Sequence, residues 1–312
     1  MATTTQPTRP SAAARIRRRR VVLGIATLAV ALALYVAIGF ALAWASMQPK
    51  RRAPTESPKD YGLAFEPISF RSADGVDLRG WYVPAGRARP RGVVIMCHGI
   101  DGTRQQMLGN ARTLHRIGCA SVLFDFRARG ESGGSMCTLG YREPDDVLAA
   151  IAWAKARPEL RGAPVGLLGA SLGGATAIMA AARSPHVRAV CVEAPFSQLD
   201  RAVDCNFRRL AGGAGPLLAF PTRQAGQLIL GRSGADISPV REIGRIAPRP
   251  VFIIADQEDD LFPAIETQAL YRAAGEPKQI WTVPGAGHCG AGYMQPDEYK
   301  RRVTRFFLDN LK

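Results

Sequence analysis

Cysteine patterns that mark metal or redox sites are missing from this 312-residue chain. It has six cysteines but no C-x-x-C pair, which argues against a zinc site or a thioredoxin-like site. Cys97, Cys119 and Cys191 lie in or beside apolar strand-like runs, where a free cysteine behaves as a small hydrophobic side chain. Cys137 and Cys205 lie in loop-like sequence, and a disulfide between them stays open because sequence alone does not give connectivity.

Acidic residues are absent from the first 52 positions, where nine basic residues gather. The net charge of the chain is +15, so the other residues carry only +6, with both signs interspersed and no long basic stripe. A recognisable nucleic-acid reading motif is also missing. We therefore expect no nucleic-acid partner and attribute the basic terminus to membrane topology. The nine residues are Arg9, Arg15, Arg17, Arg18, Arg19, Arg20, Lys50, Arg51 and Arg52.

Charge of either sign is missing from Val21 to Met47, a run of 27 residues rich in Ala, Leu and Val. As a helix, this run is long enough to cross a hydrocarbon core of about 30 Å. More basic residues precede it than follow it, which by the positive-inside rule places residues 1–20 in the cytoplasm. We expect a transmembrane helix at 21–47 with the folded domain outside, in the periplasm if the source is a Gram-negative bacterium.

A cleaved signal peptide is the alternative, because Ala43-Trp44-Ala45 resembles an A-x-A cleavage site. The apolar core of a signal peptide is about 7–15 residues long, and this run is much longer. The uncleaved anchor is therefore the preferred interpretation. Residues 48–60, with three Pro and several charges, are predicted to form a linker, and residues 61–312 a folded domain.

From residue 61 onward, short apolar runs alternate with helix-like segments. This alternation predicts an α/β fold with a mostly parallel, eight-stranded sheet flanked by helices. The first two strands should form a hairpin across Asp74-Gly75 and supply an antiparallel edge. The expected strands are 65–70, 76–83, 92–97, 120–126, 164–170, 187–193, 250–255 and 279–283, and the expected helices are 103–117, 144–156, 172–182, 264–274 and 296–311.

One segment, residues 195–247, does not fit the alternation. It contains Gly212-Gly213, Gly215-Pro216 and Pro221, followed by a short amphipathic stretch. Because Gly and Pro interrupt regular elements, we interpret this segment as an insertion between two strands, about the size of a small lid.

The motif G-x-S-x-G occurs as Gly169-Ala170-Ser171-Leu172-Gly173. The pattern is weak by itself, but here an apolar strand enters it and an alanine-rich helix leaves it. A strand–turn–helix with glycine on both sides of a serine is typical of a nucleophile elbow, which exposes the serine hydroxyl at the edge of a sheet. The alternative is an ordinary strand–helix turn with a capping serine. We interpret Ser171 as a nucleophile.

A serine hydroxyl needs an adjacent base to become a good nucleophile. His288 is the strongest candidate of the four histidines, because it lies in a glycine-rich loop after the last expected strand. His98 belongs to an earlier turn, and His115 and His186 are expected at the surface.

A carboxylate must orient the imidazole of that base. The expected strand 250–255 ends in Asp256-Gln257-Glu258-Asp259-Asp260, so several acids compete, and Glu193 at the end of an earlier strand is a further rival. The order Ser171, Asp259, His288 matches the nucleophile–acid–base order of hydrolases built on such an elbow.

An oxyanion hole requires backbone N–H groups that point at the developing negative charge. Leu172, directly after the nucleophile, should supply one of them. The second should come from the turn His98-Gly99-Ile100-Asp101-Gly102, where Ile100 is the preferred donor and Asp101 stays open. The alternative is an ordinary glycine-containing turn.

Over about residues 65–312, the order and spacing of five motifs resemble those of the α/β-hydrolases. These motifs are His98-Gly99, the segment 125–134 (DFRARGESGG), the elbow, Asp259-Asp260-Leu261-Phe262-Pro263 and Gly287-His288. The likeness is greater to the membrane-anchored, small-lid hydrolases of the Bem46 and ABHD types, and more distant to the prolyl-oligopeptidase-like branch. In those relatives the catalytic acid is the Asp four positions before the Pro of a D-x-x-V-P-like motif, which implies Asp259 rather than Asp260. Ala128 stands where a glycine is common, and Phe262 where a small aliphatic residue is usual.

The resemblance implies esterase, thioesterase, lipase or peptidase chemistry without a cofactor. We therefore expect a serine hydrolase that cleaves an ester or thioester of a small acyl substrate, such as a lipid or a peptide ester. Ser171, His288 and Asp259 would form the triad, and the Leu172 and Ile100 amides the oxyanion hole. Peptidase and acyltransferase activity on the same residues stay open, as does a non-catalytic binding protein on the same scaffold.

Overall fold

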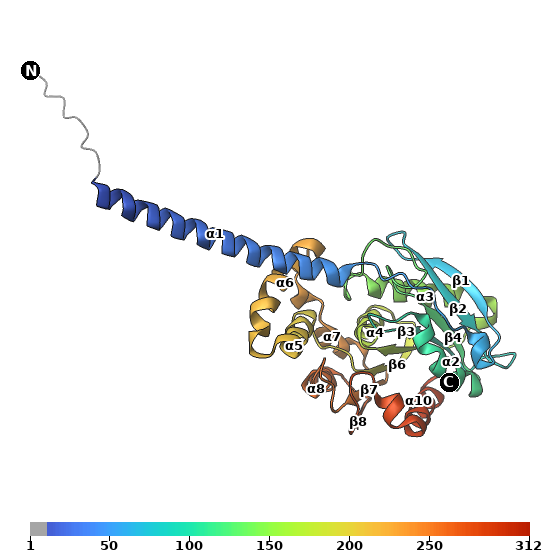
Figure 1. Cartoon of the computed structure of the whole chain (residues 1–312). Helices are drawn as coiled ribbons and strands as arrows, with labels where there is room; N and C mark the ends of the chain where they lie inside the picture. Colours follow the sequence, from blue (N-terminus) through green and yellow to red (C-terminus); the bar gives the residue numbers. More distant parts are fainter. Residues whose placement is uncertain (1–10) are drawn as a thin grey trace, which may run out of the picture.

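The eight strands form one mixed sheet in the order β1-β2-β4-β3-β5-β6-β7-β8, as the computed structural model of residues 11–312 shows (Figure 1). The hairpin of β1 and β2 is antiparallel and joins β4 antiparallel, whereas all later neighbours are parallel. The predicted α/β fold with an antiparallel edge is confirmed. The strands are β1 (Glu66–Arg71), β2 (Asp77–Val83), β3 (Val93–Cys97), β4 (Ala120–Phe124), β5 (Val165–Ala170), β6 (Val187–Glu193), β7 (Val251–Asp256) and β8 (Lys278–Val283).

Helices cover both faces of this sheet. The α3 and α4 helices pack on one face, and α2 and α10 pack on the other. Every residue of β3, β4, β5 and β7 is buried, which explains why these strands appear in the sequence as continuous apolar runs. The helices of the sheet layers are α2 (Leu108–Arg116), α3 (Glu143–Ala156), α4 (Leu172–Arg183), α8 (Ala264–Ala273), α9 (Ala291–Met294) and α10 (Pro296–Asn310).

The insertion expected at 195–247 is a helical lid between β6 and β7. Its elements are α5 (Leu199–Ala211), α6 (Gly215–Leu230) and α7 (Pro239–Glu242). The glycine-rich joint at 212–214 lets α5 and α6 turn back on each other, and Pro221 lies inside α6. Cys205 lies in α5 rather than in a loop, and all six cysteines are free, so the disulfide that was left open is not formed.

A single 36-residue helix, α1 (Ala12–Met47), contains the predicted segment 21–47 and begins earlier, at the Ser11 cap. It has a mean hydropathy of 2.6 over its most apolar window, none of which is buried. Its last turns pack on the lid, where Gly39, Ala43 and Met47 are buried. Arg9 and the first part of the predicted basic segment 1–20 lie outside the described residues.

The segment predicted as a linker, 48–60, is bonded to the domain. The Lys50 N–H donates to the Ala128 carbonyl at 2.9 Å, and the Cys137 N–H donates to the Met47 carbonyl at 2.9 Å. The Lys50 ammonium also pairs with Asp101. The end of α1 is therefore held in a fixed position beside the loops that follow β3 and β4.

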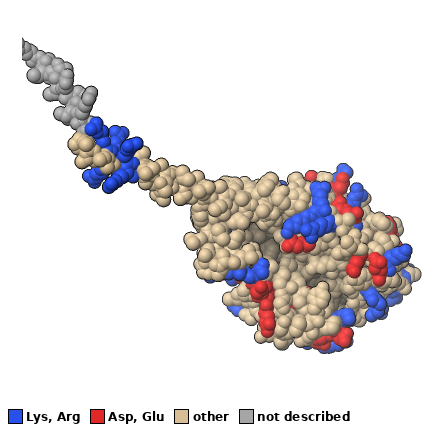
Figure 2. Space-filling view, in the orientation of Figure 1, with Lys and Arg blue, Asp and Glu red and all other residues tan. Residues whose placement is uncertain are grey.

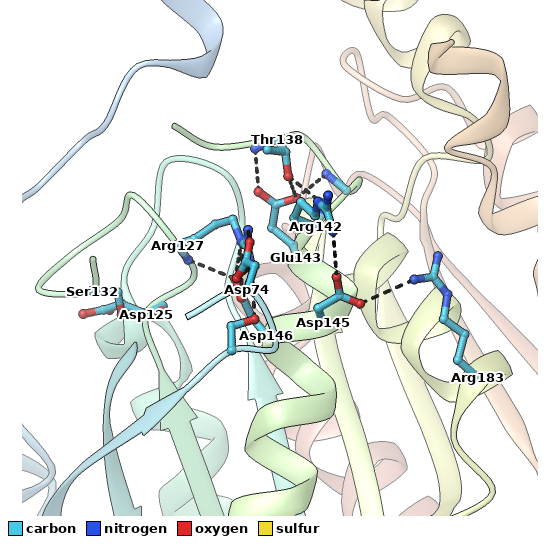
Figure 3. Close-up of polar contacts among 12 residues, drawn as sticks. Asp74, Asp125, Arg127, Ser132, Thr138, Arg142, Glu143, Asp145, Asp146 and Arg183 are labelled. Carbon is cyan, nitrogen blue, oxygen red and sulfur yellow. Dashed lines mark hydrogen bonds and ion pairs between the residues drawn. The ribbon is translucent and has the colours of Figure 1, made fainter. Parts of the chain in front are cut away.

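A buried ion-pair cluster fixes the loop between β4 and α3 (Figure 3). The Arg127 guanidinium contacts Asp146 at 2.6 Å and Asp74 at 2.7 Å, and it also donates to Ser72. Burial raises the pKa of Asp146 to about 6, while Arg127 acts in the opposite direction. Because a buried charge is costly without its partner, breaking these contacts should be strongly destabilising.

Candidate active site

Ser171 lies at a sharp turn between β5 and α4. Its φ of 55° and ψ of −121° are strained for a residue with a side chain. A Cβ on Gly169 would approach the Gly173 carbonyl oxygen to 2.5 Å, and one on Gly173 would approach the Cys97 carbonyl oxygen to 2.1 Å. Only glycine fits at both positions, so the turn has the geometry of a nucleophile elbow.

The imidazole of His288 lies between Ser171 and Asp259. Its Nε2 is 2.8 Å from the Ser171 Oγ, and its Nδ1 is 2.7 Å from the Asp259 Oδ2. These distances fit a neutral imidazole that donates from Nδ1 to the carboxylate and accepts the serine proton at Nε2. The Phe262 ring packs edge-on against the imidazole at a centroid distance of 5.1 Å, so this larger residue replaces the usual aliphatic one without displacing His288.

Asp259 is held by its own loop. Its Oδ1 accepts from the N–H groups of Leu261 and Phe262 at 2.9 and 2.8 Å. Its side chain is 1 % exposed, whereas that of Asp260 is 68 % exposed and lies 3.7 Å from Arg209. Of the acids left open by the sequence, Asp259 is the one in hydrogen-bond contact with His288.

Glu193, the rival carboxylate, points to a different partner. Its Oε1 accepts from the Ala291 N–H at 3.1 Å. Burial, and then the nearby Asp256 carboxylate, raise the pKa of Glu193 to about 8. The side chain lines a cavity of about 270 Å³ whose walls include Gln106, Ala170 and Tyr299. This raised pKa favours the protonated form of the Glu193 side chain at neutral pH, and the Glu193 carbonyl accepts from the Ser171 N–H at 2.9 Å.

The two expected oxyanion donors are free. Within residues 11–312, the N–H groups of Leu172 and Ile100 donate no hydrogen bond. A Cβ built on Gly99 would lie 3.6 Å from the Ser171 Cβ, so this turn lies against the nucleophile. Free N–H groups in that place are suited to binding an oxyanion.

Two side chains that sequence reasoning missed hold the turn that is expected to supply the second oxyanion donor. Arg129 donates from Nε to the Ile100 carbonyl at 2.6 Å, and Gln106 accepts from the Gly99 N–H at 2.8 Å. Arg129 lies in the segment 125–134 that carries the family resemblance, but its target is 29 residues away, and no local pattern indicates it. Ala128, beside it, adopts a φ of 56°, where glycine would fit at lower cost.

The remaining histidines have other contacts. The buried His98 ring lies 2.7 Å from the Gly99 carbonyl oxygen through Nδ1 and accepts from the Phe126 N–H at 3.0 Å through Nε2. His115 Nδ1 lies 3.0 Å from the Pro84 carbonyl oxygen, and His186 is exposed. Within residues 11–312, no three His, Cys, Asp or Glu side chains are grouped closely enough to hold a metal ion.

An apolar cluster links the elbow to the lid and to the end of α1. It joins Leu172 and Phe262 to residues from α5 and to Met47. The contribution of Met47 is a second feature that the sequence did not predict. The buried members are Met47, Cys137, Leu139, Leu172, Ala175, Met179, Phe196, Leu199, Ala202, Ile237 and Phe262.

One relative in sequence is the uncharacterized protein Rv2307c of Mycobacterium tuberculosis, which is 31% identical over 237 residues, or 75% of this chain and 76% of the relative. A model of the S15 family, X-Pro dipeptidyl-peptidases, matches residues 71–206. Among solved structures, the esterase Pf2001 of Pyrococcus furiosus has a TM-score of 0.73 and 26% identity, and the match covers 85% of this chain and 98% of the esterase. This chain belongs to the same family as Rv2307c, and its fold is that of the α/β-hydrolases.

Within this group of α/β-hydrolases, one relative carries a different activity in its name. The polyketide transferase ATR5 of Stachybotrys chlorohalonatus is 24% identical over 294 residues, which is 77% of this chain and 98% of the transferase. The S15 match ends at residue 206, before the loops that carry Asp259 and His288. The comparisons therefore support hydrolase chemistry in general and leave its acceptor and substrate open.

Proposed function

We propose that this α/β-hydrolase cleaves esters or thioesters through a covalent acyl-enzyme on Ser171. The observation that carries the proposal is the continuous chain of contacts from the Ser171 hydroxyl through His288 to Asp259, at 2.8 and 2.7 Å. A serine, an imidazole and a buried carboxylate at these distances form a nucleophile, a general base and its orienting group.

The reaction follows from the roles of these three groups. His288 takes the Ser171 proton at Nε2 as the hydroxyl oxygen attacks the acyl carbonyl. The Leu172 and Ile100 N–H groups stabilise the resulting oxyanion, an effect of about 3–4 kcal/mol per donor. The imidazolium then protonates the leaving alcohol or thiol. Water, deprotonated by the same imidazole, attacks the acyl-enzyme and releases the carboxylic acid.

The test is ester hydrolysis by the full chain in detergent, with p-nitrophenyl esters of increasing acyl length. Ser171→Ala should lower kcat by about 10⁴-fold or more, because it removes the nucleophile. The exposed Ser69 on β1 offers a matched control, since Ser69→Ala removes a hydroxyl far from His288. A Ser171→Ala enzyme that keeps more than a tenth of the wild-type rate would reject the proposal, as would an inactive wild type, which would instead indicate a non-catalytic binding protein.

Acyl transfer to an alcohol is the second candidate, favoured by the likeness to the polyketide transferase. The same acyl-enzyme would form, and only the final acceptor would differ. Product analysis with added glycerol separates the two activities. Hydrolysis alone yields the free acid, whereas a transferase yields mostly the glycerol ester at acceptor concentrations well below that of water.

We also propose that α1 is an uncleaved membrane anchor with its N-terminus in the cytoplasm and the hydrolase domain outside. Cleavage after Ala45 would remove Gly39 and Ala43, which are buried against the lid. The mass of the isolated protein tests retention of α1, and loss of the first 45 residues would contradict it. Protease added to spheroplasts should digest the domain, and full protection would reverse the orientation.

A further inference from the structure

The tip of the lid exposes large apolar side chains to the outside. Leu210, Leu217 and Phe220 are 63 %, 65 % and 53 % exposed. They belong to a run from residue 210 to 222 that has no charged residue. We call residues 210–220 the lid tip. An apolar surface of this kind usually has a partner that covers it.

The packing of α6 on α1 fixes where the lid tip lies. A Cβ on Gly39 would come within 2.6 Å of Pro221, and a Cβ on Gly226 would come within 3.6 Å of the Met47 Cε. Later residues of α1 thus meet later residues of α6, so the two helices run in the same direction. The lid tip, which precedes Pro221, therefore points toward the earlier, charge-free part of α1.

The length of α1 gives the level of the lid tip relative to a bilayer. About 20 helical residues cross a hydrocarbon core of about 30 Å. Counted from Val21, directly after the arginines, such a span ends near Phe40. Gly39 and the Pro221 packed on it then lie at the far boundary of the hydrocarbon. The lid packs on α1 from Gly39, at the end of this span, to Met47 beyond it.

The positions of the charged side chains at the surface agree with a lid tip that lies at the boundary of the hydrocarbon. Figure 2 shows an uncharged surface that continues from the projecting helix onto the adjoining part of the domain, with Lys, Arg, Asp and Glu farther away. The exposed Trp44 on α1 is of the type enriched at membrane interfaces. Arg208 and Arg209 directly precede the uncharged run and are exposed, so they are suited to contact lipid phosphates.

We propose that the lid tip is a second membrane contact, and that it inserts into the leaflet where α1 emerges. The occupant of its apolar surface is phospholipid, because the surface is continuous with that of a helix whose apolar residues are themselves exposed. The α5 helix that leads to the tip also contributes Leu199 to the apolar cluster beside Leu172. Insertion of the lid tip therefore places the acyl site beside the bilayer. This inference rests on the proposed function, and the substrate class it selects is lipid esters dissolved in the membrane.

The depth of the tip is measured by tryptophan quenching with the full chain in vesicles of phosphatidylcholine and phosphatidylglycerol. In a Trp44→Phe background, Phe220→Trp reports on the tip, and Ile265→Trp is the control because Ile265 is 56 % exposed on α8, away from α1. Brominated phosphatidylcholine should lower the emission added by Phe220→Trp about twofold or more and leave that of Ile265→Trp nearly unchanged. Equal quenching of the two variants would overturn the proposal. It would also be overturned if Phe220→Trp were not quenched and two chains could be cross-linked, because the lid tip would then contact a second copy of the chain.

A kinetic ratio tests the substrate class separately. The double variant Leu217→Glu and Phe220→Glu should hydrolyse a long-chain ester in vesicles about tenfold more slowly relative to a soluble short-chain ester. Ile265→Glu should leave that ratio at the wild-type value, and an unchanged ratio in the double variant would refute lipid delivery. A wild type without ester hydrolysis would reject the proposed function and not the membrane contact, because quenching is measured without turnover.

Discussion

The sheet half of this α/β-hydrolase-fold chain and its lid half differ in where their apolar residues find partners. In the sheet, buried strands pack on helices that follow them closely in sequence, as β5 packs on α4. In the lid, α6 packs chiefly on α1, whose last turn ends at Met47, far earlier in the chain. Because its packing is local, the sheet half has a pattern that can be recognised in the sequence. The lid packs on a distant partner, so its sequence shows no such pattern. Changes at the sheet edge should therefore have large effects, and changes at the α1–lid contact smaller ones.

The largest effect is expected at the acid of the sheet edge. Asp259→Asn keeps the shape of the side chain but removes the charge that orients His288, so kcat should fall by about 10⁴-fold. Asp260→Asn is the matched control, because its carboxylate is 68 % exposed and pairs at 3.7 Å with Arg209. Steady-state ester hydrolysis measures both. Comparable losses in the two variants would contradict the assignment of Asp259.

A large loss of stability is expected at the buried cluster of Figure 3. Arg127→Met leaves Asp146 buried without its cation, so the free energy of unfolding should fall by about 3–5 kcal/mol. Arg142→Met is the control on a partly exposed pair, since the Arg142 side chain is 45 % exposed and lies 3.9 Å from Asp145, and it should cost less than about 1 kcal/mol. Denaturant unfolding of the detergent-solubilised chain would test the difference, and a loss below 1 kcal/mol at Arg127 would be incompatible with it.

The next effect depends on pH. The pKa of Glu193 is raised by burial to about 8, so the folded chain holds a proton that the unfolded chain loses above about pH 4.5. Titration of Glu193 alone should therefore lower the free energy of unfolding of the wild type as pH rises, by about 1.4 kcal/mol per unit and about 3 kcal/mol between pH 5 and pH 7.5.

Glu193→Gln has no such proton to lose. It should match the wild type near pH 5 and exceed its melting temperature near pH 7.5. Melting curves across this range provide the measurement. Parallel curves for wild type and variant would show that Glu193 titrates normally.

The smallest effect is expected in the lid half. Gly39→Val should push α6 away from α1, because even a Cβ would lie 2.6 Å from Pro221, and overpacking of this kind costs about 1–3 kcal/mol. Gly24→Val on the same helix meets nothing within 4 Å and serves as the control. Limited proteolysis of the lid would report the loosening. Equal cleavage rates would argue against the α1–lid contact.

The sequence predicted the parts that depend on short-range patterns. The strands and sheet helices are near their expected positions, and the elbow motif placed Ser171 at a strand–helix turn because both glycines are sterically required there. Chain order and the resemblance pointed to Asp259 and His288, which lie in contact.

The features that sequence reasoning missed depend on contacts between distant segments. The support of the Ile100 carbonyl by Arg129, and the bonding of residues 48–60 to the domain, follow no periodicity or local motif. The same holds for Met47 in the apolar cluster, because nothing in an apolar helix indicates that one residue is buried by a lid. The lid helices could be placed only as an irregular insertion, since Gly and Pro obscure their pattern.

The most direct measurement is the position of a covalent adduct. The full chain is treated with a fluorophosphonate, digested and analysed by mass spectrometry. The account predicts one adduct on the peptide that contains Ser171, abolished in Ser171→Ala and strongly slowed in His288→Ala. An adduct on another residue, or undiminished labelling of Ser171→Ala, would contradict it.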